Sequence, residues 1–281
     1  MGLLLHCGCE LVEPHILKDL KPPVPKSDTH VPLKHWDLYQ SIVKAFDRTG
    51  HIDIVGEPQI GLSHDAMRCF GFLDIITKAT QDTDGVIMDG EVKLQAVFRN
   101  ANDFAFPANF SASTFSFACD NLAFSTTLPF GHPCGEEGNE WKGRKHTKFI
   151  LDELPQLLDD SIARLIDDAD LFEKRYPIYK DTKMNNKQMH DIVCRSLDVP
   201  NGKKNVITTT FVEPVLREWY EPTYREYTGR TAWSAFSAFT SAGTKGTVKR
   251  PIPINEQAIR TKHLHDIFDD FCGVNERIVL N

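Results

Sequence analysis

The apolar residues of this chain change their spacing near Lys148, and this change constrains the fold more than any other feature. Upstream of it, short apolar runs alternate with a period of two, which is typical of strands with one buried face. The clearest run places four residues on one face: Val92, Leu94, Ala96 and Phe98. Downstream, apolar residues recur every three or four positions, as along one side of a helix. They are Leu151, Leu154, Leu158, Ile162, Leu165, Ala169 and Phe172.

A helix is also expected before the strands. The proline-rich connector from Lys21 to Pro32 should be extended, because proline fixes its own φ and restricts the residue before it. Helical spacing follows from about Lys34 to Arg48, and Gly50 can end the helix in a left-handed turn. The expected buried stripe is Trp36, Tyr39, Val43 and Phe46.

Four strand-like runs lie between this helix and Lys148: HIDIV, MRCFGFLDII, EVKLQAVFR and STFSFAC. The opening MGLLLHCGCELV is short and lacks the basic start of a signal peptide, so we expect it to form a buried strand. The chain thus predicts an α+β fold: one helix, an antiparallel β-meander, a long amphipathic helix and a helical C-terminal region. The long helix should bury Leu158, Ile162, Leu165 and Phe172 against the sheet, opposite Phe98, Phe115 or Phe117.

Beyond Pro177 the pattern predicts shorter helices at 186–197, 210–220, 230–242 and 255–272. We therefore expect an α+β core over residues 1–180 and a helical region over residues 181–281 that packs on it. The segment from Gly243 to Pro253 is predicted to be a loop, and its basic residues make it a candidate arm for binding a strand or a partner.

The composition indicates a packed globule. The chain has 281 residues, 41% of them hydrophobic, with 18 phenylalanines, which is enough apolar surface for a large core. No apolar run approaches the roughly 20 residues that span a bilayer, so no membrane association is expected. The seven cysteines are odd in number and irregularly spaced, which favours a reduced, cytoplasmic chain over a disulfide framework.

Charge is unevenly distributed, although the net charge is −7. One basic island surrounds His146 and consists of Lys142, Arg144, Lys145 and Lys148, and a second consists of Lys245, Lys249 and Arg250. Between them lies an acidic run: Asp152, Glu153, Asp159, Asp160, Asp167, Asp168, Asp170 and Glu173. Segregated signs let a protein bind an anion on one face while the other face keeps it in solution. Ordinary solvated surfaces remain the simpler interpretation.

Patterns for metal, nucleophilic and phosphate-transfer chemistry are weak or missing. His6, Cys7, Cys9, His132 and Cys134 lack the paired spacing of a zinc site, and core packing explains them more simply. Cys119 or Cys134 with His146 is a remote nucleophile arrangement, and the adjacent His64 and Asp65 look like a turn. No GxxxxGK[ST] loop occurs, which disfavours ATP-driven activity. We expect no cofactor and no metal, and an enzyme is the less favoured reading.

Aromatic residues with basic neighbours suggest nucleic-acid binding. Proteins that bind single strands stack bases on aromatic faces and hold the backbone with cations. The stacking candidates are Phe104 and Phe106, and the candidate backbone contacts are Arg99, Arg144, Lys145, His146 and Lys148, with Lys245, Lys249 and Arg250 in the second island. Strand phenylalanines more often pack a core, so this reading competes with a structural one.

Several blocks of the chain resemble, in the same order, the phage- and plasmid-borne family known as domain of unknown function 932. These are LLLHCGCELV, VPLKHWDLYQSIVKAF, FACDNLAF, RKHTKFI, REWYEPTYREY and RTAWSAFSAFT. The resemblance implies a mobile genetic element as habitat and supplies no chemistry. One departure is visible: an Asn-Ser-His-Asp run is expected after Arg99, where this chain has Asn-Ala-Asn-Asp.

The order of elements is similar to that of ATP-independent single-strand annealing proteins of phages. The leading hypothesis is a phage- or plasmid-encoded protein that binds and anneals single-stranded DNA, as a homo-oligomer, in the cytoplasm of a host cell. The aromatic and arginine-rich REWYEPTYREY, with RTAWSAFSAFT, is the expected subunit contact. The alternative is an accessory protein that inhibits a host defence protein through its acidic surface, and a hydrolase or nuclease ranks third.

Overall fold

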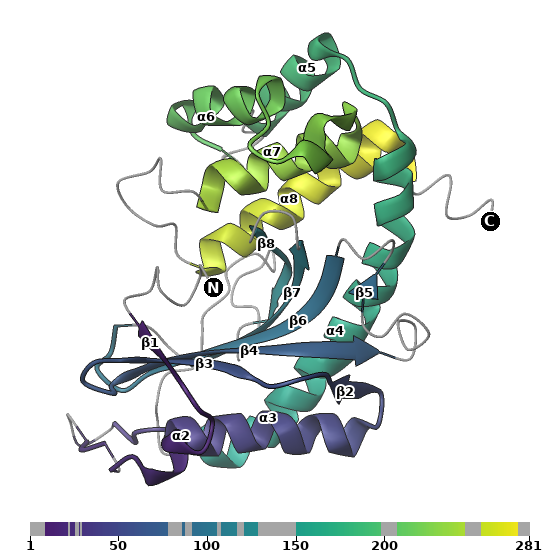
Figure 1. The fold of residues 1–281 in the computed structure, drawn as a ribbon. Helices are drawn as coiled ribbons and strands as arrows, with labels where there is room; N and C mark the ends of the chain where they lie inside the picture. The colour runs from purple at the N-terminus through teal and green to yellow at the C-terminus, as the bar shows by residue number, and fades with distance from the viewer. Residues whose placement is uncertain are drawn as a thin grey trace. The chain divides into compact units, whose positions relative to one another are not determined.

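The computed structural model describes residues 9–21, 23–25, 28, 30–77, 86–87, 92–105, 108–116, 121–128, 150–197, 207–244 and 254–274 (Figure 1). The chain divides into two compact units. The first, called the sheet unit here, is Met1–Thr114 with Thr127–Ala169, and the second, called the helical unit, is Phe115–Thr126 with Asp170–Asn281. The division falls inside the long helix, whereas the sequence suggested a division after residue 180. An α+β fold is confirmed.

Eight strands form one sheet in the part of the chain that the structure describes. They are β1 (Cys9–Val12), β2 (Ile52–Ile54), β3 (Gln59–Ser63), β4 (Arg68–Thr77), β5 (Val86–Ile87), β6 (Val92–Ala101), β7 (Asn109–Ser116) and β8 (Asn121–Leu128). The main order is β1-β3-β4-β6-β7-β8, while β2 pairs with β4 and β5 pairs with β6. The pairings from β1 to β6 are antiparallel, so the predicted meander is confirmed.

The sheet differs from the sequence prediction at its edge and at its centre. At the edge, β1 buries Cys9 but leaves Leu11 60% exposed, so the expectation of a buried opening strand is wrong for Leu11. Residues 1–8 lie outside the described residues. At the centre, every residue of β6 from Leu94 to Ala101 is buried, which means that both faces are covered rather than one.

The first two helices belong to the sheet unit: α2 (Ile16–Asp19) and α3 (His35–Thr49). As predicted, α3 ends at Gly50, whose φ is 61° and whose N–H donates to the carbonyl of Phe46 at 3.1 Å. The predicted stripe was rotated by about one residue, because the helix buries His35, Leu38, Ile42, Ala45 and Phe46. Trp36, Tyr39 and Val43 lie at the flank of this face and are only half-buried.

A glycine in the central sheet makes room for an aromatic ring. Phe98 of β6 is paired in register with Gly71 of β4. A Cβ atom on Gly71 would lie 2.1 Å from the Phe98 ring, so no other residue fits there without moving the ring. The same ring lies 6.2 Å from Tyr39 of α3. Phe98 was one of three residues predicted to lie opposite the long helix, and the contact that the structure gives for its ring is with α3.

The long helix is α4 (Ile150–Asp181), and its predicted apolar stripe is confirmed. The stripe is buried at Leu154, Leu158, Ile162, Leu165 and Phe172, and burial continues through Tyr176 and Tyr179. Within the sheet unit, the guanidinium of Arg48 on α3 pairs with the carboxylate of Asp159 on α4. Phe172 contacts Trp233 at a ring distance of 6.2 Å, so this end of the stripe packs against α7, a neighbour that was not predicted.

The helical unit contains α5 (Asn186–Leu197), α6 (Thr209–Tyr220), the 3₁₀ turn η3 (Arg225–Gly229), α7 (Ala232–Thr244) and α8 (Ile254–Cys272). All four predicted C-terminal helices are confirmed, with bounds within two residues. From Ala232 to Phe239 every residue of α7 is buried, because the helix lies in the core of the unit. This burial leaves RTAWSAFSAFT little surface for the predicted subunit contact, whereas REWYEPTYREY keeps exposed residues. Over the described residues, no helix is both long enough and apolar enough to cross a membrane.

Candidate functional site

A pocket of about 410 Å³ opens in the sheet unit. Its walls come from α2 and the connector after it, the start of α3, the turn between β3 and β4, and the end of β6. The apolar lining consists of Leu17, Leu20, Pro23, Val24 and Met67. This volume lies in the range of roughly 300–1,000 Å³ that is typical of small-ligand sites.

Polar residues line the rest of this pocket: Lys21, Lys34, His35, Asp65 and Asn102. Both lysines are exposed, whereas His35 and Asn102 are buried. None of these residues was predicted from the sequence to bind a ligand. Apolar walls with two ammonium groups suit a ligand that combines a flat apolar body with a negative charge.

His35 anchors the pocket and is not available for proton transfer. Its Nε2 donates to the carbonyl of Ala66 at 3.0 Å, and its Nδ1 accepts from the amide of Asn100 at 2.9 Å. Burial lowers the pKa of the imidazole, so the ring is neutral near pH 7. Because both nitrogens are engaged, His35 holds the β3–β4 turn and β6 to the start of α3.

Asn102 and Asn100 clamp the end of the connector. The Asn102 side chain accepts from the N–H of Leu33 at 3.1 Å and donates to its carbonyl at 3.0 Å. Asn100 donates to the same carbonyl at 2.6 Å. The departure from the expected Asn-Ser-His-Asp run thus has a structural role here, because Asn102 fixes a backbone segment over the sheet.

Two carboxylates, that of Asp65 in the pocket lining and that of Asp103 next to Asn102 in the chain, accept hydrogen bonds from nearby donors. Asp65 accepts from the Ser63 hydroxyl at 2.6 Å and from the Met67 N–H at 3.1 Å, and these bonds lower its pKa. Partial burial opposes ionisation of Asp103, but hydrogen bonds from the Ala105 N–H and from Arg68 outweigh it and lower the pKa. Both groups are therefore ionised near pH 7. The interpretation of His64 and Asp65 as a turn is confirmed.

Phe104 is the exposed aromatic residue nearest to the pocket along the chain. It follows Asn102 by two positions and is 59% exposed. Its φ of 69° is in the left-handed region, which costs a bulky residue on the order of 1–3 kcal/mol. One side of the ring contacts His30 at a centroid distance of 4.4 Å. Residues held in a strained backbone conformation are concentrated at functional sites, which makes Phe104 a candidate binding residue.

The other predicted DNA contacts are placed less favourably or lie outside the described residues. Arg99 is only 9% exposed, so burial disfavours its predicted contact with a DNA backbone. Those outside the described residues are Phe106, Arg144, Lys145, His146, Lys148, Lys245, Lys249 and Arg250. Their roles stay predictions.

The described residues contain no cluster of three or more His, Cys, Asp or Glu side chains that could hold a metal ion. His6, Cys7, Cys119, His132, Cys134 and His146 lie outside those residues. Cys9 and Cys69 are buried in the sheet, where burial raises the pKa of the Cys69 thiol and makes it unreactive.

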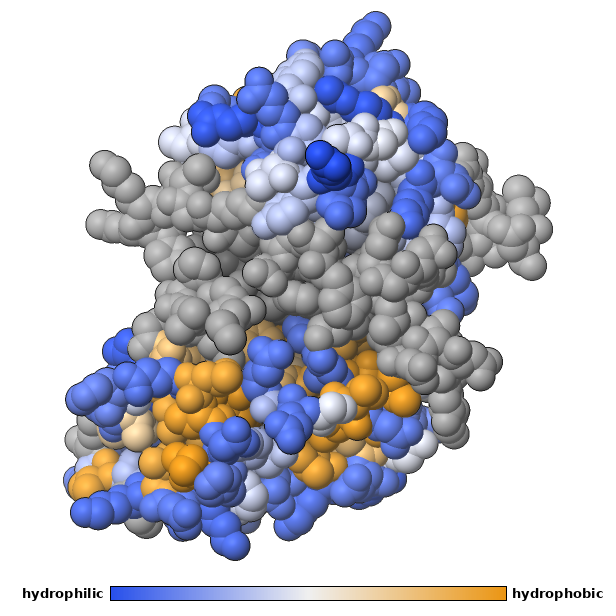
Figure 2. Space-filling view, in the orientation of Figure 1, coloured by the Kyte–Doolittle hydropathy of each residue, from blue (hydrophilic) through white to orange (hydrophobic). Residues whose placement is uncertain are grey.

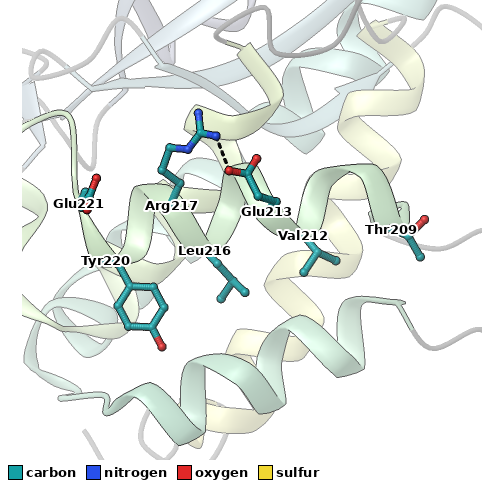
Figure 3. Close-up of a pocket in the computed structure, with 7 residues that line it drawn as sticks. All are labelled: Thr209, Val212, Glu213, Leu216, Arg217, Tyr220 and Glu221. Atoms are coloured by element: carbon teal, nitrogen blue, oxygen red, sulfur yellow. Dashed lines mark hydrogen bonds and ion pairs between the residues drawn. The ribbon is translucent and has the colours of Figure 1, made fainter.

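A second, shallower groove of about 580 Å³ lies along α6 in the helical unit (Figure 3). Val212, Leu216 and Tyr220 project to the same side of the helix, as Figure 3 shows. Glu213 and Arg217 form an ion pair that points the other way in this view but also lines the groove. The groove is open to solvent, and its Glu213 and Arg217 side chains neutralise each other, so it suits a protein surface better than a small substrate.

The helical unit also buries a polar cluster between α4 and α8. Arg175 donates to Asp269 through its Nε at 2.9 Å, and the Tyr179 hydroxyl donates to the same carboxylate at 2.6 Å. The ring of His265 lies 4.5 Å from that of Phe236, and burial followed by the charge of Arg175 lowers its pKa to about 3. Tyr179, His265 and Asp269 are all buried, and the cluster therefore belongs to the core.

Comparisons with known proteins do not add to these findings. No protein-family model, no curated protein and no solved structure matches the chain. The resemblance to domain of unknown function 932 is thus neither supported nor contradicted. The molecule is defined by its own features: an α+β fold, a mixed apolar and cationic pocket in the sheet unit, and an open apolar groove in the helical unit.

Proposed function

We propose that this protein binds single-stranded DNA and promotes its annealing without ATP, as a homo-oligomer encoded by a phage or plasmid and acting in the host cytoplasm. The observation that carries the proposal is the exposed ring of Phe104, two residues from a wall of the pocket that Lys21 and Lys34 line. Stacking on one aromatic residue and attraction to cations are the two contacts that non-specific single-strand binders combine.

The pocket fits one nucleotide of such a strand. Its apolar wall suits a base, while the ammonium groups of Lys21 and Lys34 suit a phosphate. The locked hydrogen bonds of His35 and Asn102 supply a rigid wall, which lowers the entropy lost on binding. The rim carboxylate of Asp65 repels phosphate, so the phosphate is expected on the lysine side.

Fluorescence anisotropy with a labelled single strand tests the proposal at a series of salt concentrations. Phe104→Ala should weaken binding by about 5- to 150-fold, because stacking contributes roughly 1–3 kcal/mol per base. Leu11→Ala is the matched control, since Leu11 is similarly exposed in the same unit. Equal affinity of the Phe104 variant and wild type would show that the ring does not contact the strand. If wild type does not bind single strands at low salt, the proposed function is wrong.

The cations are tested by the salt dependence of the same binding curve. Lys21→Ala and Lys34→Ala should each reduce the slope of log K against log salt by about 0.7, the value for one phosphate contact with a single strand. A triple glutamate variant of Arg144, Lys145 and Lys148 should reduce affinity while thermal unfolding stays unchanged. Wild-type affinity in the triple variant would exclude that island from the function.

The alternative function, inhibition of a host defence protein, has one observation in its favour. Asp152, Asp160 and Asp167 are exposed along α4, and an acidic helix face can imitate a phosphate backbone. Neutralising all three carboxylates separates the two functions. Under the DNA-binding proposal, single-strand affinity should rise or stay constant, whereas an inhibitor that imitates DNA should lose its protein target.

A further inference from the structure

We infer that the exposed face of α6 pairs with the same face of a second copy of this chain, with the two helices antiparallel across a two-fold axis. Two features of α6 support this partner: an apolar stripe with a fixed aromatic end, and a charge pattern that is complementary to itself. The inference rests on one part of the proposed function, the homo-oligomer, and does not require that the protein binds DNA.

The apolar stripe has the spacing of a helix–helix contact. Val212, Leu216 and Tyr220 are four residues apart, so they form one row along the helix (Figure 3). Val212 and Leu216 are half-buried and Tyr220 is 41% exposed, which leaves the row incompletely covered by its own unit. An antiparallel copy centred near Leu216 would place Val212 of one chain beside Tyr220 of the other.

Tyr220 is already held in one position. Its hydroxyl hydrogen-bonds Nε2 of His190 on α5 at 2.9 Å, and the guanidinium of Arg230 lies 5.6 Å from the centre of its ring. A tyrosine fixed in this way loses little side-chain entropy when a partner covers it. Tyrosine is also among the residues that contribute most to protein–protein contacts.

The charges beside the stripe favour a second copy over a partner of one sign. Glu213 and Arg217 are one helical turn apart, and their side chains are 67% and 59% exposed. With the same axis near Leu216, Glu213 of each copy lies about 3 Å along the helix direction from Arg217 of the other copy, which is within reach of these long side chains. A two-fold axis therefore creates two favourable pairs from one pattern. A uniformly acidic or basic partner would meet one like charge for each opposite one.

Charge reversal combined with mixing tests this inference. Sedimentation velocity on the full chain should show a species of twice 31.8 kDa at high concentration for wild type. Glu213→Arg and Arg217→Glu should each raise the dissociation constant at least tenfold, because each puts like charges opposite one another. An equimolar mixture of the two variants should associate as tightly as wild type, since one copy then carries two cations and the other two carboxylates.

Controls separate this contact from unfolding and from other surfaces. Asp191 and Arg195 form a similar exposed ion pair on α5, and Arg195→Glu should leave association unchanged. Leu216→Asp should abolish association without lowering helix content. Three results would each overturn the inference. These are unchanged association of both single variants, no recovery of association in their mixture, and a wild-type protein that stays monomeric at all concentrations. A monomer that still binds single-stranded DNA would overturn the α6 pairing and leave the DNA-binding proposal intact.

Discussion

The sheet unit and the helical unit each bury a histidine, and the two sites show how differently the units are held together. In the sheet unit, hydrogen bonds engage both nitrogens of His35. In the helical unit, His265 lies between aromatic rings, 4.5 Å from Phe236 and 6.0 Å from Tyr179. The first ring ties irregular backbone to a strand, whereas the second fills space between helices.

This difference explains where each unit offers a binding surface. Polar clamps in the sheet unit hold a connector and a turn that have no regular partner, and the pocket lies between those segments. The helical unit packs its helices on one another, and the open surface described in it is the groove along α6. In Figure 2 the visible side of the sheet unit also shows several apolar patches, while that of the helical unit is mostly hydrophilic.

The largest effect is expected in the buried cluster of the helical unit. Asp269→Ala removes the acceptor of Arg175 and Tyr179, and leaving a buried charge without its partner costs about 3–5 kcal/mol. Asp270→Ala is the matched control, because that neighbouring side chain is 74% exposed in its pair with Arg195. Peptide-resolved hydrogen exchange should show faster exchange in α4 and α8 for the first variant alone. Equal destabilisation by both variants would contradict the central role of the cluster.

A somewhat smaller effect is expected in the core of the sheet unit. Gly71→Ala places a methyl group 2.1 Å from the Phe98 ring, and overpacking of this kind costs about 1–3 kcal/mol. Gly229→Ala is the control, since the nearest neighbouring atom there is 3.8 Å away. Urea denaturation measures both. A neutral Gly71 variant would show that the Phe98 ring can move aside, so that the sheet unit is less tightly fixed than its hydrogen-bonded clamps suggest.

Acid should destabilise the helical unit through His265, whose pKa is lowered to about 3. Below its ordinary value of about 6.5 the unfolded chain binds a proton that the folded chain does not, so stability falls as pH drops. The loss from this group should reach about 2 kcal/mol at pH 5 and continue towards pH 3. The contribution of His265 is isolated by measuring the free energy of unfolding of His265→Phe and of wild type at pH 7 and at pH 5. The same pH dependence in both proteins would mean that His265 is protonated in the folded state.

The smallest effect is expected at the surface of the sheet unit. Arg48 and Asp159 join α3 to α4 through an ion pair with side chains 48% and 35% exposed. Solvent screens such pairs, and Arg48→Ala should cost less than about 1 kcal/mol. High salt should abolish even this difference in thermal unfolding. A loss above 2 kcal/mol would show that the sheet unit depends on surface charge more than its clamps suggest.

The helices were predictable from sequence because their apolar spacing is local. The bounds of α5 and α8 differ from the predicted ones by at most one residue. Strand β3 was not predicted, since its five residues include Gly61 and show no clear alternation. The rotated stripe of α3 has a tertiary cause: Trp36 and Tyr39 are long enough to lie at the flank, while smaller residues such as Ala45 fit under the sheet.

The pocket was not predictable, because its residues come from distant parts of the chain. His35 and Asn100 are 65 positions apart, and Leu33 and Asn102 are 69 apart. One signal was present. Asn100 and Asn102 are two residues apart in a strand pattern that is otherwise largely apolar, so they share one face. Two amides on a buried face need partners, and that need indicates an irregular segment packed over the strand.

The clamp at Leu33 has a consequence for which residues the connector can contain. The Asn102 amide exchanges two hydrogen bonds with the backbone of Leu33, as a residue on an adjacent antiparallel strand would. Proline has no N–H to donate, so it can stand directly before the clamped residue, as Pro32 does, but not at position 33 itself. The connector can therefore be rich in proline and still be fastened to the sheet at its last residues.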